Sequence, residues 1–93
     1  MKVKENLVIE IIEDRYTIYN PIEDKLISLN LSGSLIFEWI LKNLKIEEMI
    51  RKYTQIYDVD ENKAREDIES LINELKKEGI IEDDKESSDS EQG

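Results

Sequence analysis

The chain has 93 residues, with 13 Lys and Arg against 23 Asp and Glu, which gives a formal net charge of −10 at neutral pH. It contains no His and no Cys, which excludes imidazole bases, thiol nucleophiles, disulfides and the zinc sites that those side chains form. Its length accommodates one small domain, and its scattered carboxylates and lysines indicate neither an enzyme nor a metal or cofactor site.

Three short segments rich in β-branched and aromatic residues lie in the first third of the chain. They are residues 7–13, 16–20 and 26–29. None has helical periodicity, so each is predicted to be a strand. Pro21 lies between the second and third segments and marks a turn, which predicts a hairpin. In the third strand Ile27 and Leu29 share one face and Leu26 and Ser28 share the other, which leaves one face for a core.

Three helical patterns follow the strands. The first is expected to begin near Ser32 with Asn30 or Ser32 as N-cap, the second near Ile46, and the third after an Asp60 N-cap. Gly79 suits the C′ position at the end of the third helix. The apolar stripes expected to face the core are Gly33, Ile36, Phe37, Ile40, Leu41 and Leu44 in the first helix, Ile46, Met49, Ile50 and Tyr53 with Ile56 or Tyr57 in the second, and Ala64, Ile68, Leu71 and Leu75 in the third.

These elements predict an α+β, winged-helix-like domain: a three-stranded antiparallel sheet followed by three helices. The domain is expected to span residues 1–81. Residues 82–93 carry half of the net charge of −10 and no apolar side chain, which predicts a disordered acidic tail.

Charge and hydropathy also limit the partners. Both parts of the chain are acidic, which argues against nucleic-acid binding, because affinity for phosphates comes from Lys and Arg. No apolar run reaches membrane-spanning length and the N-terminus has no signal-like apolar region, so we expect no membrane and a cytoplasmic location.

Two junctions carry a family resemblance. Leu29-Asn30 enters the first helix directly from the third strand, and Leu75 is followed by Gly79-Ile80-Ile81 at the end of the third helix. With the order of the elements, these junctions make residues 7–81 resemble the PqqD-like family of stand-alone peptide recognition elements. The connection at residues 43–45 departs from the family, which commonly has a Gly turn there and a Ser or Thr cap on the second helix.

The resemblance implies a non-catalytic protein that binds the leader of a ribosomally synthesised precursor peptide. The leader would add as a strand in the groove between the third strand and the third helix, and the protein would deliver the precursor to a modifying enzyme, such as a radical SAM maturase or a cyclase and leader peptidase. No cofactor is implied. The peptide-binding residues would be Leu26, Ile27, Ser28 and Leu29 on the strand and Arg65, Ile68, Ile72 and Lys76 on the helix.

The helical wheel of the third helix supplies the second part of that set. Ile72 lies beside the core stripe, with Arg65 and Lys76 beyond it. Ile68 and Ile72 are therefore expected to form the groove wall, and the two basic side chains to receive an acidic side chain of the leader. On the opposite flank lie Asp67, Glu74 and Glu78. The simpler interpretation is that Ile72 widens the core stripe and that the charges form a solvated face.

Leu35 and Trp39 form an i, i+4 pair off the core stripe of the first helix. They are either an exposed patch that contacts the partner enzyme, since Trp is favoured in interfaces, or they pack against the first strand or the N-terminal segment. Two other functions remain open: a winged-helix transcription regulator with the third helix in the major groove, and a general protein-interaction domain. The exposed side chains of the third helix include too few cations to favour the regulator.

Overall fold

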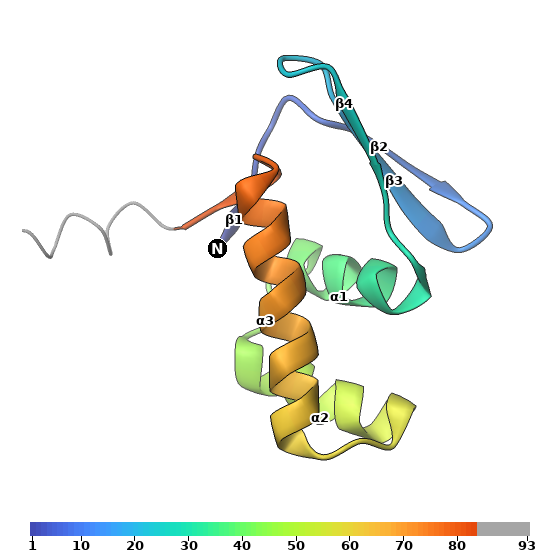
Figure 1. The fold of residues 1–93 in the computed structure, drawn as a ribbon, viewed down its shortest axis with the longest axis vertical. Coiled ribbons are helices and arrows are strands. Elements are labelled where there is room, and N and C mark those ends of the chain that lie inside the picture. Colours follow the sequence, from blue (N-terminus) through green and yellow to red (C-terminus); the bar gives the residue numbers. More distant parts are fainter. Residues whose placement is uncertain (84–93) are drawn as a thin grey trace, which may run out of the picture.

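In the computed structural model, which describes residues 1–83, a three-stranded antiparallel sheet precedes three helices (Figure 1). The sheet has the order β2-β3-β4, and a separate two-stranded sheet pairs β1 with β5. The elements are β1 (Lys2–Val3), β2 (Val8–Ile12), β3 (Arg15–Asn20), β4 (Lys25–Ser28), α1 (Leu31–Leu41), α2 (Ile46–Tyr57), α3 (Glu61–Lys77) and β5 (Ile81–Glu82). The predicted α+β architecture is confirmed.

The two hairpins form where the sequence supplies turn residues. Glu13 and Asp14 join β2 to β3 and both have positive φ, 54° and 65°, as a two-residue turn between right-twisted strands requires. In the second turn, the Asn20 side-chain oxygen accepts from the N–H groups of Ile22 (3.1 Å) and Glu23 (3.3 Å). These local bonds set the register in which Ile18 lies opposite Ile27.

Two polar side chains fix the junction between β4 and α1. The Asn30 carboxamide accepts from the Gly33 N–H at 2.8 Å and caps the helix, which identifies Asn30 as the N-cap. Buried Ser34 accepts from the Tyr16 N–H at 2.8 Å. Because Ser34 is in the first turn of α1 and Tyr16 is in β3, this bond ties the helix to the sheet.

The ends of α3 follow the sequence signals. The Asp60 carboxylate accepts from the Lys63 N–H at 2.8 Å, as an N-cap does. At the other end Gly79 has φ +76° and the Ile80 N–H donates to the Leu75 carbonyl at 2.9 Å, which is the Schellman arrangement. Ile80 and Ile81 are buried beneath the helix end.

The pairing of β1 with β5 is absent from the sequence-based prediction. Val3 lies opposite Ile81 and Lys2 opposite Glu82. Glu82, the first residue of the predicted acidic tail, therefore lies in a strand, and the part of that tail from residue 84 onward lies outside the described residues. Two-residue strands are too short to produce a recognisable sequence period.

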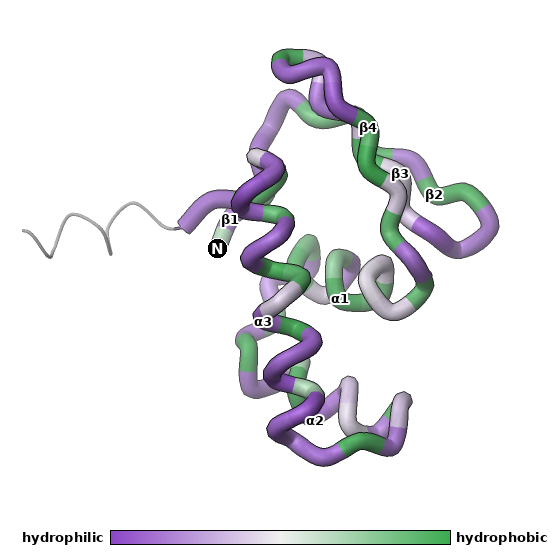
Figure 2. The backbone as a smooth tube through the Cα atoms, viewed as in Figure 1, coloured by the Kyte–Doolittle hydropathy of each residue, from purple (hydrophilic) through white to green (hydrophobic). Residues whose placement is uncertain are grey.

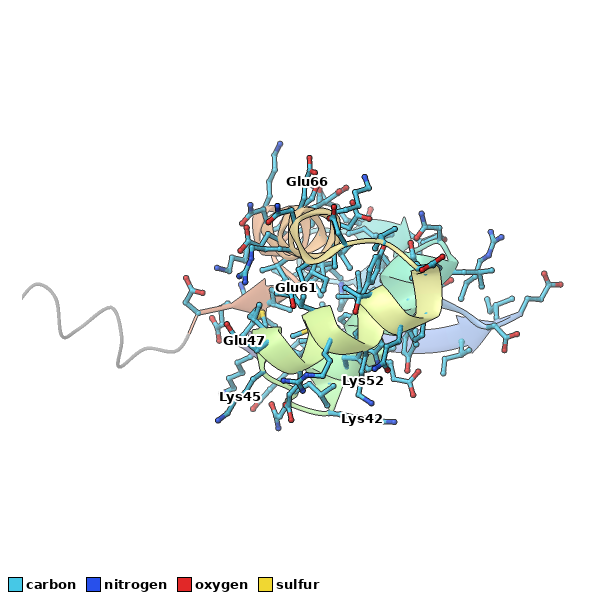
Figure 3. All side chains as sticks on the ribbon, turned by 90° about the horizontal axis from the view of Figure 1, so that it is seen from below. Lys42, Lys45, Glu47, Lys52, Glu61 and Glu66 are labelled. Atoms are coloured by element: carbon cyan, nitrogen blue, oxygen red, sulfur yellow. The ribbon has the colours of Figure 1, made fainter. Side chains whose placement is uncertain are left out.

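The core lies between the inner face of the sheet and the three helices. Charged side chains such as Lys52 and Glu66 extend from the outer sides of α2 and α3 (Figure 3), whereas α1 has one charged residue, Glu38, and is mainly green to white in Figure 2. The Phe37 ring meets the Tyr16 ring edge to face, with centroids 5.2 Å apart, a favourable geometry for aromatic pairs.

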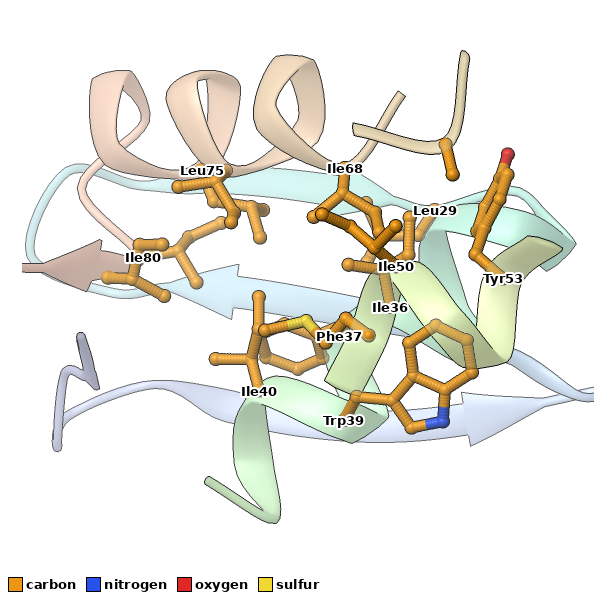
Figure 4. Packing of buried hydrophobic residues seen from close by; sticks show 14 of the residues in the cluster. Leu29, Ile36, Phe37, Trp39, Ile40, Ile50, Tyr53, Ile68, Leu75 and Ile80 are labelled. Atoms are coloured by element: carbon orange, nitrogen blue, oxygen red, sulfur yellow. The ribbon is translucent and has the colours of Figure 1, made fainter. Parts of the chain in front are cut away.

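The burial of α1 decides between the two alternatives for Leu35 and Trp39 in favour of packing, and it corrects the assignment of Leu41. Trp39 is only 6% exposed, and Figure 4 shows its indole within the cluster of buried side chains. Leu35 is half-buried against the same cluster. Leu41, assigned to the core stripe, is 39% exposed. The reason is that α1 lies between the sheet and α2 (Figure 1), so that more than one face of the helix is covered.

The end of α2 is also less buried than its stripe predicts. Ile56 and Tyr57 are 54% and 38% exposed, whereas Met49, Ile50 and Tyr53 are buried. Tyr57 instead packs beside Tyr53, with ring centroids 4.7 Å apart. The last turn of α2 therefore extends beyond the part that α3 covers.

Candidate functional site

Within residues 1–83 β4 is an edge strand, because the sheet order β2-β3-β4 leaves it with β3 as its one neighbour. The Leu29 N–H donates to the Tyr16 carbonyl at 2.9 Å, so the N–H of Leu29 faces β3. Bonded and non-bonded pairs alternate along an antiparallel ladder, which directs the backbone groups of Ile27 toward β3. The N–H and C=O groups of Leu26 and Ser28 therefore point toward the open edge.

A hollow of about 180 Å³ lies between this strand and α3. Its lining consists of Ile27, Ser28, Leu29, Asn30, Leu71, Glu74, Leu75 and Glu78. A second hollow of about 310 Å³ shares Asn30, Leu71 and Glu74 with the first and extends to Tyr53 and Asp67. We call the two together the β4–α3 groove.

The start of α1 closes the bottom of the groove. Gly33 lines the second hollow, and a Cβ atom at this position would lie 3.0 Å from the Asn30 side-chain oxygen and 3.7 Å from Leu71 Cδ1. The distance to Leu71 is an ordinary van der Waals contact, whereas the distance to the Asn30 oxygen is tight, so the missing side chain leaves room for the Asn30 cap. Leu71 remains half-buried, so part of its side chain is available to a bound molecule.

The helical side of the groove is acidic. Glu78 pairs with Lys25 of β4 at 3.2 Å, a contact that crosses the groove at one end. Asp67 accepts a hydrogen bond from the Tyr53 hydroxyl at 2.8 Å and pairs with Lys63 at 3.1 Å. Glu74 lines both hollows, and among residues 1–83 no ion pair compensates its carboxylate.

The Tyr53–Asp67 contact also changes the acidity of both groups. Burial, together with the hydrogen bond to the Asp67 carboxylate, raises the pKa of Tyr53 to about 12. The same hydrogen bond, assisted by Lys63, holds the pKa of Asp67 below its ordinary value. At neutral pH the pair is therefore a neutral phenol donating to a carboxylate, which joins α2 to α3 at the far end of the groove.

Four residues of the predicted site, all on α3, do not line the β4–α3 groove. Ile68 and Ile72 are 0% and 6% exposed and belong to the core. Arg65 pairs with Glu69 at 3.9 Å, and Lys76 pairs with Asp83 at 2.7 Å, next to β5. The groove faces the opposite flank of α3, where Leu71, Glu74 and Glu78 lie.

The strand residues of the predicted site do lie together at the groove. Ile27, Ser28 and Leu29 are in its lining, and Leu26 is 67% exposed on the outer face of the sheet. A contact of these residues with a peptide stays a prediction. The second predicted surface, Leu35 with Trp39, is not an exposed patch, because the Trp39 indole is buried.

Two further features bear on the class of site. Across residues 1–83, three or more acidic side chains nowhere gather in an arrangement suited to a metal ion. None of the helices in that part of the chain has the length and apolar character needed to cross a bilayer.

Comparisons with known proteins identify relatives of this fold. The family model for coenzyme PQQ synthesis protein D (PqqD) matches residues 10–81. The structure of TbiB1 in complex with the TbiA(beta) leader peptide has a TM-score of 0.83 and 21% identity, over 88% of this chain and 95% of that chain. The structure of lasso peptide synthetase B1 complexed with the leader peptide has a TM-score of 0.82 and 18% identity, over 88% of this chain and 96% of that chain. None of the curated proteins compared with this sequence matches it significantly.

Proposed function

The chain belongs to the PqqD family, and we propose on this basis that it binds the leader of a ribosomally synthesised precursor peptide. The leader adds to the three-stranded sheet as a further strand beside β4 and lies in the β4–α3 groove. Two solved structures with a similar fold are complexes with leader peptides, which supports this function.

The open edge of β4 is the observation that carries the proposal. The backbone groups of Leu26 and Ser28 point outward from the sheet, next to a groove with apolar and charged walls. An edge of this kind is a template for another strand. In such strand addition the backbone hydrogen bonds supply affinity, and the pockets for alternate side chains supply specificity.

The groove is large enough for useful affinity. Leu71 and Ile27 offer apolar surface to a peptide, and each apolar side chain that becomes fully buried contributes about 1.5–3 kcal/mol. Two or three such anchors with the backbone hydrogen bonds, reduced by the cost of ordering the peptide, correspond to micromolar binding, about −8 kcal/mol.

We further propose that the protein is a carrier without catalysis of its own, which presents the precursor to a modifying enzyme. The enzyme is of the radical SAM maturase class or a cyclase and leader peptidase. The lack of His and Cys in the whole chain supports a role in binding rather than in chemistry. A partner surface at Leu35 and Trp39 is not part of this proposal, since Trp39 is buried.

Fluorescence anisotropy tests the function with short peptides translated from the reading frames next to the gene, each divided into a leader half and a core half. The labelled leader half is expected to bind with micromolar or tighter affinity, and the labelled core half to bind at least about tenfold more weakly. A labelled DNA duplex in the same assay should not bind at physiological salt, because the net charge is −10. Binding of the core half alone contradicts leader recognition, and salt-sensitive, sub-micromolar binding of the duplex favours the transcription regulator.

A further inference from the structure

The wall of the β4–α3 groove contains one apolar row and one acidic row. Leu71 and Leu75 are four residues apart on α3, and so are Glu74 and Glu78. All four line the hollow beside β4. Residues four apart lie above one another on a helix. Leu75 is 1% exposed, so a peptide in the groove meets Leu71 of the apolar row and, beside it, the row of glutamates.

The carboxylates of the groove differ in their availability. Lys25 already compensates Glu78 at 3.2 Å, and Lys63 with the Tyr53 hydroxyl compensates Asp67. Glu74 is exposed and, among residues 1–83, has no ion-pair partner. A cationic side chain entering the groove gains an attraction to Glu74, whereas an anionic one is repelled by it and loses water.

The spacing of the two rows matches an extended peptide. Side chains on one face of a strand are two residues, or about 6.6 Å, apart. Along α3, Glu74 is three residues and about 4.5 Å beyond Leu71, and Glu78 is seven residues and about 10.5 Å beyond it. If one side chain of the peptide lies over Leu71, the next on the same face falls between the levels of the two glutamates, within reach of a long Lys or Arg.

We propose, resting on the leader-binding function above, that the bound segment is basic. It contains an apolar residue and a Lys or Arg two positions apart on one face, and the cation pairs with Glu74. The acidic surface of the protein as a whole, with a net charge of −10, additionally attracts a cationic peptide and speeds its encounter with the groove. This inference replaces the acidic leader side chain that the sequence predicted.

A display selection with random peptides tests the inference, whatever the sequence of the natural leader. Random 14-residue peptides are selected in parallel against the parent protein, Glu74→Lys and the control Glu66→Lys. Glu66 is an exposed residue of the same helix that extends away from the body (Figure 3), so the control has the same charge change outside the groove. Parent and control are expected to enrich peptides with Lys or Arg two positions from an apolar residue, and Glu74→Lys to lose that enrichment.

An enriched peptide is then synthesised and its affinity measured by anisotropy. Glu74→Lys should weaken its binding about three- to tenfold, because the reversal removes an attraction and adds a repulsion, and Glu66→Lys should change it less than about twofold. The difference in peptide affinity between Glu74→Lys and the parent should become smaller at high salt, because salt screens the charges. Mapping by ¹⁵N amide shifts should place the peptide on β4 and α3.

Two results overturn the inference and can be told apart. In the first, the parent enriches peptides with a neutral or acidic residue two positions from the apolar one, or Glu74→Lys binds an enriched basic peptide as tightly as the parent does. The groove then does not select a basic segment, while leader binding at β4 stands. If the amide shifts of a bound peptide fall away from β4 and α3, then the proposed site fails as well.

Discussion

Replacement of Ser28 by Pro should weaken leader binding at least about tenfold and leave the fold intact. The Ser28 N–H points to the open edge of β4, so proline removes a donor for the added strand, and its ring fills the space that the strand needs. The ladder between β3 and β4 does not use this N–H, and proline is tolerated on edge strands in that orientation. Leader anisotropy gives the affinity, and thermal denaturation checks the fold.

Ile11→Pro is the matched control on the opposite edge of the sheet. In β3 the backbone groups of Tyr16 and Ile18 face β4. Those of Thr17, the residue between them, therefore face β2, where Thr17 lies opposite Glu10. The N–H of Ile11 therefore points away from the sheet, as that of Ser28 does. We expect this variant to bind the leader within about twofold of the parent. Equal losses for both proline variants, or none for Ser28→Pro, contradict strand addition at β4.

Trp39→Ala should lower the free energy of unfolding by about 3–5 kcal/mol, the cost of removing a large aromatic side chain from a packed core. The indole is only 6% exposed. For a domain whose total stability is about 5–15 kcal/mol, this loss is a large fraction of the free energy of unfolding. Urea denaturation followed by circular dichroism measures the change.

Leu41→Ala is the control for this substitution, since Leu41 ends the same helix and is 39% exposed. We expect it to cost less than about 1 kcal/mol. The sequence pattern predicts the opposite order, with Leu41 in the core stripe and Trp39 off it. If Trp39→Ala lowers the free energy of unfolding no more than Leu41→Ala does, Trp39 is a surface residue. Leu35 and Trp39 would then again be candidates for a partner surface.

Local chemistry explains which parts of the fold were predictable. The three longer strands, the Pro21 turn and the caps at Asn30, Asp60 and Gly79 each depend on residues close in sequence, and the structure confirms them. The β1–β5 pair depends on two segments about 80 residues apart, each too short to have a period.

The faces of α1 were less predictable, because a single stripe implies a helix covered on one side. This helix has one charged residue, Glu38, and it lies between the sheet and α2 (Figure 1). A helix with so little polar surface is packed on several sides, and that composition was the available signal for the burial of Trp39.

The groove illustrates a different limit. Periodicity correctly separated two flanks of α3, one with Ile72, Arg65 and Lys76 and the other with Glu74 and Glu78. Which flank faces β4 depends on the path of the chain through α1 and α2, and no local pattern contains that path. The choice of flank decides the sign of charge in the groove, and with it the chemistry of the peptide that the groove fits.

Amide hydrogen exchange of the complex tests the central claim, addition of the leader as a strand at β4, most directly. On saturation with the leader, exchange at Leu26 and Ser28 should slow at least about tenfold, because their N–H groups become bonded to the peptide. Ile27, whose N–H already faces β3, should change much less. This alternation is specific to strand addition. Unchanged exchange at both Leu26 and Ser28, with new protection on another surface, contradicts the account.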